Sequence, residues 1–368
     1  MLRYDATAAR WQALAGGLAL RADTAQPLSA AQQAQSRANA GVPNRNYLIN
    51  PSGEINQAGV GAQSDASYDF DQWLTLTQAN PVSVSQLVDA EDGTPFMMRT
   101  LQSNAAAQRF GRIQWLEKLL CRELRGQPVT LSARVRISAA ATLRYAIVEW
   151  TGAADAIAKD VVNDWSSASF AAGGFFTAAS TVVVASGAMA LGANTLTDLA
   201  PLTGTVSSAM NNLAVLLWTD AAQPQNVSLD IGKVKLEKGA VPTPFVAPPF
   251  DQSLAACQRY WCKSYDYATA PGTATRIGAD GVYVAGAATN NGGVYPRFPV
   301  RMRIAPSGGI TVYSSASGTA GVLRDAGNAV DLAAIIDLVG ERGFRGFTAV
   351  GTGSILLLDC HYTASARL

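Results

Sequence analysis

Charged side chains are scarce in this sequence. Asp, Glu, Lys and Arg make up 15% of its 368 residues, against roughly 25% in a typical soluble domain. A long-helix protein would be rich in Glu and Lys, so this composition favours a mainly β protein with a Ser-, Thr-, Asn-, Gln- and Gly-rich surface. The net charge is only +1 and no dense basic run occurs, so we expect no nucleic-acid partner.

Catalytic motifs are also missing. The sequence has no GxSxG elbow, no HExxH and no P-loop, and His361 is its one histidine. Cys360 precedes His361 in a stretch that predicts a strand, where neighbouring side chains point to opposite faces, so the two cannot form a dyad. We therefore expect no enzyme activity and no cofactor.

Signals for export or for a membrane span are absent as well. The first residues show neither the apolar core nor the cleavage site of a secretory signal, so we expect assembly in a reducing cytosol. Ser, Thr and Gly interrupt the uncharged stretch 165–197, which predicts strands and turns and no membrane insertion. The cysteines are expected to be unpaired, buried thiols: Cys121, Cys257, Cys262 and Cys360.

The length is enough for two or three domains, at roughly 100–200 residues each. No repeat of fixed period is present, which argues against a right-handed β-helix. Changes in residue pattern divide the chain into an N-terminal helical segment (1–45), a first β-domain (46–238), a proline-rich linker (239–252) and a second, distal β-domain (253–368).

The N-terminal segment is rich in Ala and Gln. Ser29 and Gln32 form a capping-box pattern, and Gly41 marks the end of the helix that follows. A second helix is expected over 7–20, where Trp11 and two leucines have helical spacing. Two short helices with little apolar surface cannot form a core alone, so we expect this segment to associate with copies of itself or with another protein.

From residue 46 the pattern changes to a period of two. Residues 129–137 (VTLSARVRI) alternate between apolar and polar, which predicts a strand with one buried face. The fully apolar run 213–218 is typical of a central strand. Between 227 and 236 the parity of the apolar positions flips at Gly232, which predicts a β-bulge.

Other segments carry simpler signals. Apolar residues at helical spacing predict a helix over 110–126, whereas 143–150 predicts a strand. A short helix is expected from Ser253. Further strands are expected over 298–304 (FPVRMRI), which alternates strictly, and at ITVYS and SILLLDCHY near the C-terminus.

Three stretches resemble one family, the tail-fibre and receptor-binding proteins of tailed bacteriophages. They are LSAAQQAQSRANAGV near the N-terminus, NYLINPSGEINQAGVG with YDFDQW and the later LEKGAVPTPFVAPPFDQSLAACQRYW, and the C-terminal block from QRYWCKSYDY to HYTASARL. The second is similar to a carbohydrate-binding-module-like jelly roll. The resemblance implies a homotrimeric fibre in the virion, attached through its N-terminus to tail or baseplate proteins, with its distal β-domain meeting a host-surface glycan or another receptor.

Aromatic and arginine side chains are the candidate ligand contacts. Sugar rings stack on the flat faces of Trp and Tyr, although packing in a core is the commoner role of each. The candidates are Trp73, Trp150 and Trp165 in the first β-domain, and Tyr265, Tyr267, Tyr283, Tyr295 and Tyr313 in the second. Arg297, Arg301 and Arg303 would share one strand face, which is either a solvated face or a site for an acidic or phosphorylated glycan.

Paired carboxylates keep two alternatives open. Asp69 and Asp71 would share a strand face. The favoured interpretation is a solvated loop, and the pair is a weak candidate for a Ca²⁺ site or, less favoured, for glycoside hydrolysis. A second acidic cluster lies at 89–92. We predict a phage tail-fibre protein that adheres to host glycans; its rivals are a structural tail protein without receptor contact and a polysaccharide depolymerase.

Overall fold

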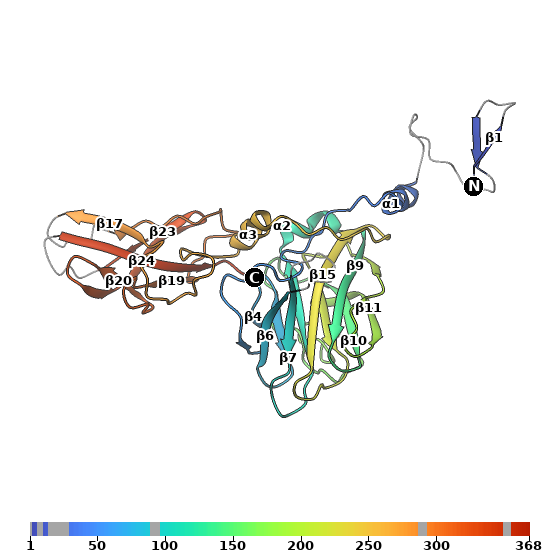
Figure 1. Ribbon diagram of the computed structural model, residues 1–368, viewed down its shortest axis with the longest axis horizontal. Helices are drawn as coiled ribbons and strands as arrows, with labels where there is room; N and C mark the ends of the chain where they lie inside the picture. Colours follow the sequence, from blue (N-terminus) through green and yellow to red (C-terminus); the bar gives the residue numbers. More distant parts are fainter. Residues whose placement is uncertain (1, 6–9, 14–28, 89–95, 286–292, 349–354) are drawn as a thin grey trace.

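The computed structural model describes residues 2–5, 10–13, 29–88, 96–285, 293–348 and 355–368. It is mainly β, with 42% strand and 7% helix, as the composition predicts. Figure 1 shows a β-sandwich, a second β-region that projects to one side from its upper end, and the described parts of the N-terminal segment on the other side of the same end. No helix in the described ranges is long and apolar enough to cross a membrane.

The sandwich consists of two antiparallel sheets. The six-stranded sheet has the order β11 (Thr181–Leu191), β10 (Ala141–Trp150), β14 (Asn212–Thr219), β8 (Phe110–Leu116), β5 (Leu74–Thr77) and β4 (Ser67–Tyr68). The seven-stranded sheet has the order β12 (Thr197–Asp198), β9 (Pro128–Ile137), β15 (Ser228–Lys238), β7 (Phe96–Leu101), β6 (Val82–Val88) and β3 (Ala62–Gln63), and β13 (Leu202–Thr205) also pairs with β9. Apolar residues of both sheets fill the space between them.

Several strands follow directly from the sequence pattern. In β9, burial alternates along the strand as the period of two predicts. Strand β14, which contains the apolar run 213–218, lies between β10 and β8 and is buried throughout. In β15 the pairing with β9 shifts between Gly232 and Lys235, and Lys233 has a φ of 48°, so the predicted bulge is confirmed.

The helix expected over 110–126 is wrong for most of its length. The segment begins with strand β8 and only then forms the single turn α2 (Lys118–Cys121) and a 3₁₀ turn, Arg122–Leu124. Both faces of β8 are buried, so apolar residues occupy positions of both parities. A short run of that kind cannot be distinguished from a buried helix by periodicity.

The N-terminal segment is part strand and part helix. Strands β1 (Leu2–Asp5) and β2 (Arg10–Ala13) form an antiparallel hairpin, so the helix expected over 7–20 is wrong at β2, and its remainder lies outside the described residues. Helix α1 (Ala30–Asn39) is confirmed with its capping box. The Ser29 amide donates to Gln32 Oε1 at 2.9 Å, and the Gln32 amide donates to Ser29 Oγ at 3.3 Å.

The C-terminal β-region is organised around one long strand. It follows helix α3 (Phe250–Gln258) and contains β16 (Trp261–Lys263), β17 (Asp280–Ala285), β18 (Gly293–Val294), β19 (Ile310–Tyr313), β20 (Val322–Asp325), β21 (Val330–Ala333), β22 (Ile335–Gly340), β23 (Gly343–Phe347) and β24 (Ile355–Ser365). β24 pairs with β16, β17, β19 and β20, whereas β18, β23 and β22 form a separate three-stranded sheet.

The strand expected over 298–304 is absent from this described stretch of chain. Pro296 and Pro299 have no N–H to donate to a ladder, which explains why strict alternation does not yield a strand here. The segment instead forms isolated hydrogen bonds with the two residues that connect β22 and β23, described below. Its alternation still has a structural role, because Phe298 and Met302 pack into the core of the C-terminal β-region.

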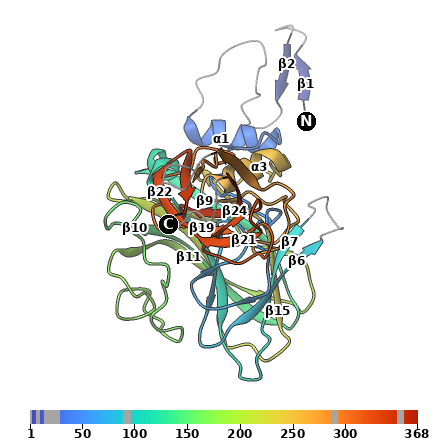
Figure 2. The same ribbon diagram turned by 90° about the vertical axis from the view of Figure 1, so that its left-hand side faces the viewer.

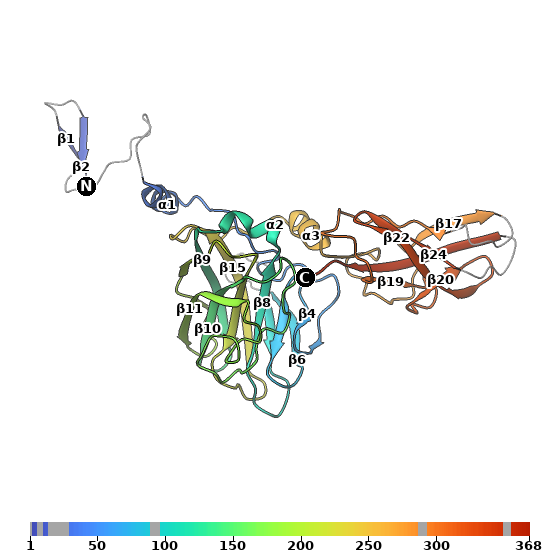
Figure 3. The same ribbon diagram turned by 180° about the vertical axis from the view of Figure 1, so that it is seen from behind.

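The two β-regions contact each other where the chain returns to the sandwich. The C-terminus lies at their junction in Figures 1 and 3. Leu368 packs against the outer face of the six-stranded sheet, and its carbonyl oxygen accepts a hydrogen bond from Tyr68 Oη at 2.9 Å. In Figure 2, which faces the C-terminal β-region, that region lies in front of the sandwich.

Candidate functional site

The outer face of the six-stranded sheet is closed by the chain itself. Trp115, Trp150 and Trp218 point outward from β8, β10 and β14. The connection between β10 and β11, residues 151–180, lies over them and adds the aromatic residues Trp165, Phe170, Phe175 and Phe176. The ring centroids of Phe175 and Trp218 are 5.1 Å apart. We call this set the outer aromatic cluster.

The three candidate tryptophans are core residues. Trp150 and Trp165 belong to the outer aromatic cluster, and Trp73 is 0% exposed between the two sheets. The indole N–H groups of Trp73 and Trp150 donate to the carbonyl oxygens of Asn50 and Ala153, each at 2.9 Å. Burial of these large rings stabilises the sandwich, and none of the three offers a face to a ligand.

The candidate carboxylates face separate cations. They lie in the turn between β4 and β5 and not on a strand. Asp69 forms a fully buried ion pair with Arg112, and Asp71 accepts from the Gln57 amide at 2.8 Å and lies 3.6 Å from Arg367. Burial raises the pKa of Asp71, opposed by Arg367. Asp69 and Asp71 therefore do not share a strand face, which was the premise of the Ca²⁺ and hydrolysis alternatives. The acidic cluster at 89–92 lies outside the described residues.

Two of the other candidates join the β-regions. The Tyr267 hydroxyl donates to the Glu54 carbonyl at 3.2 Å and accepts from the Asn56 amide at 3.0 Å. Arg303, whose side chain is 7% exposed, lies 3.5 Å from Asp155 of the sandwich. Arg303 is therefore separated from Arg297 and Arg301, contrary to the expectation of one shared strand face.

Tyr265 packs beside the one histidine. The Tyr265 ring stacks on His361 with ring centroids 3.8 Å apart. Tyr313 packs edge-on against the same Tyr265 ring. His361 is buried, with Nδ1 3.0 Å from Ser264 Oγ and Nε2 3.0 Å from the Thr275 carbonyl. Burial lowers the pKa of His361. This is a packed core histidine with both nitrogens in hydrogen-bonding contact.

The four cysteines are free and buried, as predicted. Burial raises the pKa of the Cys121 and Cys262 thiols to about 12, so these are poor nucleophiles at neutral pH. Within the described ranges, no group of three or more His, Cys, Asp or Glu residues is arranged to hold a metal ion.

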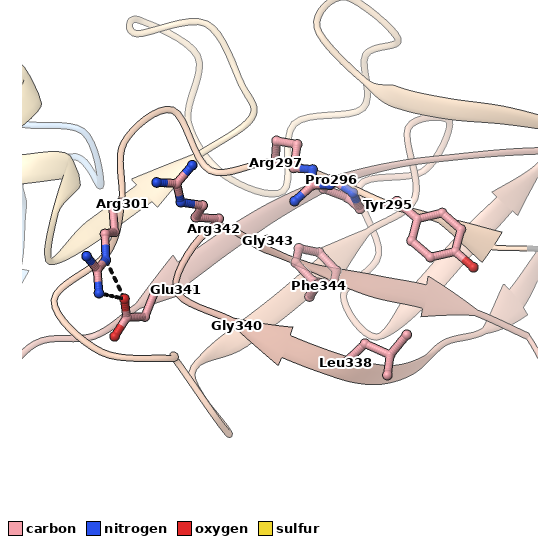
Figure 4. Close-up of a pocket in the computed structure, with 10 residues that line it drawn as sticks. All are labelled: Tyr295, Pro296, Arg297, Arg301, Leu338, Gly340, Glu341, Arg342, Gly343 and Phe344. Carbon is pink, nitrogen blue, oxygen red and sulfur yellow. Dashed lines mark hydrogen bonds and ion pairs between the residues drawn. The ribbon is translucent and has the colours of Figure 1, made fainter.

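Tyr295, Arg297 and Arg301 come together at an open groove in the C-terminal β-region. The groove has a volume of about 560 Å³ and is shown in Figure 4. Ten residues line it: Tyr295, Pro296, Arg297, Arg301, Leu338, Gly340, Glu341, Arg342, Gly343 and Phe344. Tyr295 is 56% exposed and Leu338 is 71% exposed, so both present apolar surface to solvent.

The floor of the groove is fixed by backbone hydrogen bonds between two segments far apart in sequence. The amides of Phe298 and Met302 donate to the carbonyls of Arg342 and Glu341 at 3.0 and 2.8 Å. In the other direction, the Phe344 amide donates to the Pro296 carbonyl at 3.3 Å. These three hydrogen bonds join the segment 296–302 to the β22–β23 hairpin.

Glycine makes this close approach possible. Gly340 pairs with Gly343, so Glu341 and Arg342 form the two-residue tip of the β22–β23 hairpin. A Cβ on Gly343 would overlap the carbonyl oxygen of Pro296. Arg342 was not among the predicted site residues. The GERG stretch between two apolar runs was a hairpin signal, but no sequence pattern placed it beside Tyr295.

The groove carries excess positive charge. Its lining contains three arginines and one carboxylate, Glu341. Arg301 forms an ion pair with Glu341, and the hydrogen bond from Arg301 lowers the pKa of that carboxyl. In the described parts of the chain, the Arg297 and Arg342 guanidinium groups form no ion pair. The groove thus combines an exposed aromatic ring with two guanidinium groups that form no ion pair among the described residues, although Arg342 contributes to the lowered pKa of Glu341.

Comparisons with known proteins address the fold. No protein-family model matches the chain, and no curated protein does either. Solved structures similar to it include the enzymatically active domain of bacteriophage CBA120 tailspike protein 4 (12% identity, 53% of this chain, 21% of that chain, TM-score 0.32). TmCBM61, solved with β-1,4-galactotriose, is another (10% identity, 53% of this chain, 99% of that chain, TM-score 0.32).

The C-terminal family 22 carbohydrate-binding module of Clostridium thermocellum Xyn10B is also similar (13% identity, 53% of this chain, 100% of that chain, TM-score 0.29). Their shared feature is a β-sandwich. This chain spans about a fifth of the tailspike chain that it matches. Identities this low describe a fold and leave the ligand of this chain to be argued from its own residues.

Proposed function

We propose that this protein is a bacteriophage tail-fibre or receptor-binding protein that adheres to a host-surface glycan through the groove of its C-terminal β-region. The observation that carries the proposal is the exposed groove, in which Tyr295 lies beside two arginines that have no ion-pair partner among the described residues. The sandwich offers no comparable aromatic platform on its six-stranded sheet, because the outer aromatic cluster covers that face. The proposal that the protein is part of a phage virion rests on the sequence resemblance to tail-fibre proteins.

Adhesion would be weak at each site and strengthened by repetition. The resemblance implies a homotrimer held to the tail through the N-terminal segment, with three grooves directed at one cell surface. Linked sites raise the effective concentration of the second and third contacts without any new interaction. Hydrolysis is less well supported, since glycosidases use two carboxylates and the groove lining contains one, Glu341.

The test compares two tyrosines of similar exposure. Fluorescently labelled full-length protein is first screened against a panel of bacterial strains, and a strain that binds is used for the variants. Tyr295→Ala should weaken binding by about 3- to 10-fold per site, because a stacking face is lost. Tyr283→Ala removes a ring that is 65% exposed on β17, away from the groove lining, and should bind as the wild type does.

Two results would overturn the proposal. Equal binding by the Tyr295→Ala and Tyr283→Ala variants would remove the groove from recognition. Failure of the folded protein to bind any strain, together with its burial inside the assembled particle, would favour the structural rival. Loss of surface polysaccharide during incubation would instead identify a depolymerase.

A further inference from the structure

The charges that line the groove indicate which class of saccharide it binds. We infer that it takes an acidic saccharide, with a carboxylate or phosphate held by Arg297 and Arg342 and a sugar ring on Tyr295. This rests on the proposed function and names the ligand class of the same site. The notable residue is Arg342, which reaches the groove from the tip of the β22–β23 hairpin.

The first argument is the charge balance. Three guanidinium groups and one carboxylate line the groove, and Glu341 is engaged by Arg301. This leaves two cations without a carboxylate partner among the described residues. The hydroxyl groups of a neutral saccharide can accept hydrogen bonds from these exposed cations but carry no opposite charge, whereas an anionic group forms stronger, charge-assisted hydrogen bonds with them. An anionic group of the ligand supplies the missing charge.

The second argument is the placement of these cations. Arg297 forms an antiparallel bridge with Gly343, the residue next to Arg342, so the backbones that carry both arginines are held side by side. Figure 4 shows Arg342 and Arg297 between the Arg301–Glu341 pair at one end and Tyr295 at the other. Of the two arginines, Arg297 lies nearer to Tyr295 in this view, and Arg342 lies nearer to the Arg301–Glu341 pair.

The third argument is the chemistry of the side chains. A guanidinium group presents paired N–H donors that match the oxygens of a carboxylate or a phosphate. The exposed Tyr295 and Leu338 provide apolar surface for the face of a sugar ring. Glu341 forms its ion pair with Arg301, and Arg342 adds a weaker electrostatic effect that also lowers the pKa of Glu341.

The experiment uses full-length protein and a bacterial strain that it binds. Cell-surface carboxylates are amidated in one arm, and surface phosphates are removed with cold hydrofluoric acid in the other. Wild-type binding should fall about 10-fold or more in one of the arms, which identifies the anion as carboxylate or phosphate. Added salt should weaken binding to untreated cells.

Protein variants make the assignment specific. On untreated cells, the double variant Arg297→Gln, Arg342→Gln should bind about 10- to 100-fold more weakly than the wild type. On cells whose anion has been removed, the wild type should bind no better than the double variant. The control is Arg122→Gln, which removes an exposed arginine of the sandwich and should change nothing. Thermal melts verify that all variants are folded.

The outcomes separate this inference from the proposed function. If neither chemical treatment nor the double variant changes binding while Tyr295→Ala still weakens it, the groove takes a neutral glycan and the inference is wrong. If Tyr295→Ala has no effect either, the proposed function also fails. Equal competition by poly-glutamate and by an acidic polysaccharide of matched charge would show a general anion patch and would likewise overturn the saccharide assignment.

Discussion

The sandwich and the groove of the C-terminal β-region place large aromatic and charged side chains in opposite environments. In the sandwich, Trp73 and Trp218 are buried, and even the Asp69–Arg112 ion pair is 0% exposed on both sides. In the C-terminal β-region, Tyr295 and Arg342 stand in an open groove. Residue types that look equally suited to ligand binding in the sequence therefore stabilise one region and, by our proposal, recognise a receptor in the other.

The largest effect is expected from removing an aromatic residue of the sandwich. Trp218→Ala leaves a cavity beneath Phe170 and Phe175 and should lower the free energy of unfolding by about 3–5 kcal/mol. Urea unfolding measures this loss, with Trp218→Phe as the milder control. A loss below about 1 kcal/mol would mean that the outer aromatic cluster opens easily. The contrast between a tightly packed aromatic cluster in the sandwich and an open groove in the C-terminal β-region would then be wrong.

A smaller effect is expected at the floor of the groove. Gly343→Ala forces its Cβ against the Pro296 carbonyl, and overpacking of this kind costs about 1–3 kcal/mol. Because the backbone bonds that hold the groove are disturbed, cell binding should fall along with stability. The control is Gly281→Ala on β17, where the added Cβ would be at ordinary van der Waals distance from its neighbours. Gly308 is unsuitable as a control because its φ of +76° would strain an alanine. Normal binding by Gly343→Ala would show that the floor is not needed.

The smallest effect concerns His361 and depends on pH. Burial lowers its pKa below the ordinary value of 6.5, so the folded protein favours the neutral ring. The stability that the neutral ring contributes is present above pH 6.5, the ordinary pKa of histidine. It is lost as the pH falls from 6.5 through the lower pKa of the folded protein. The wild-type melting temperature should therefore drop between about pH 8 and about pH 5.5 more than that of His361→Gln. Parallel pH profiles for the two proteins would contradict this account.

Local signals in the sequence predicted local structure well. The capping box of α1, the alternation in β9 and the bulge in β15 each depend on residues close together in the chain. Where burial on both faces or prolines altered the pattern, the expectation failed, as in β8 and over 298–304. The mainly β class survived these errors because it depends on the whole composition.

The groove could be predicted only in part. Tyr295, Arg297 and Arg301 were candidates because of their chemistry, but they were grouped with Arg303, which the structure places at the junction with the sandwich. Arg342 was missed because its position depends on pairing between segments distant in sequence. The tryptophans were weighed as ligand platforms or core residues. The packing of 151–180 over the six-stranded sheet decides for the core at Trp150 and Trp165, and burial between the two sheets decides for Trp73.

The most direct test of the account is hydrogen exchange of the full-length protein with and without envelope polysaccharide purified from a strain that it binds. We expect new protection in residues 293–302 and 338–344, which build the groove, and no change in β8, β10 or β14. Protection confined to 151–180 and these three strands, with the groove unchanged, would contradict the account and move recognition to the sandwich.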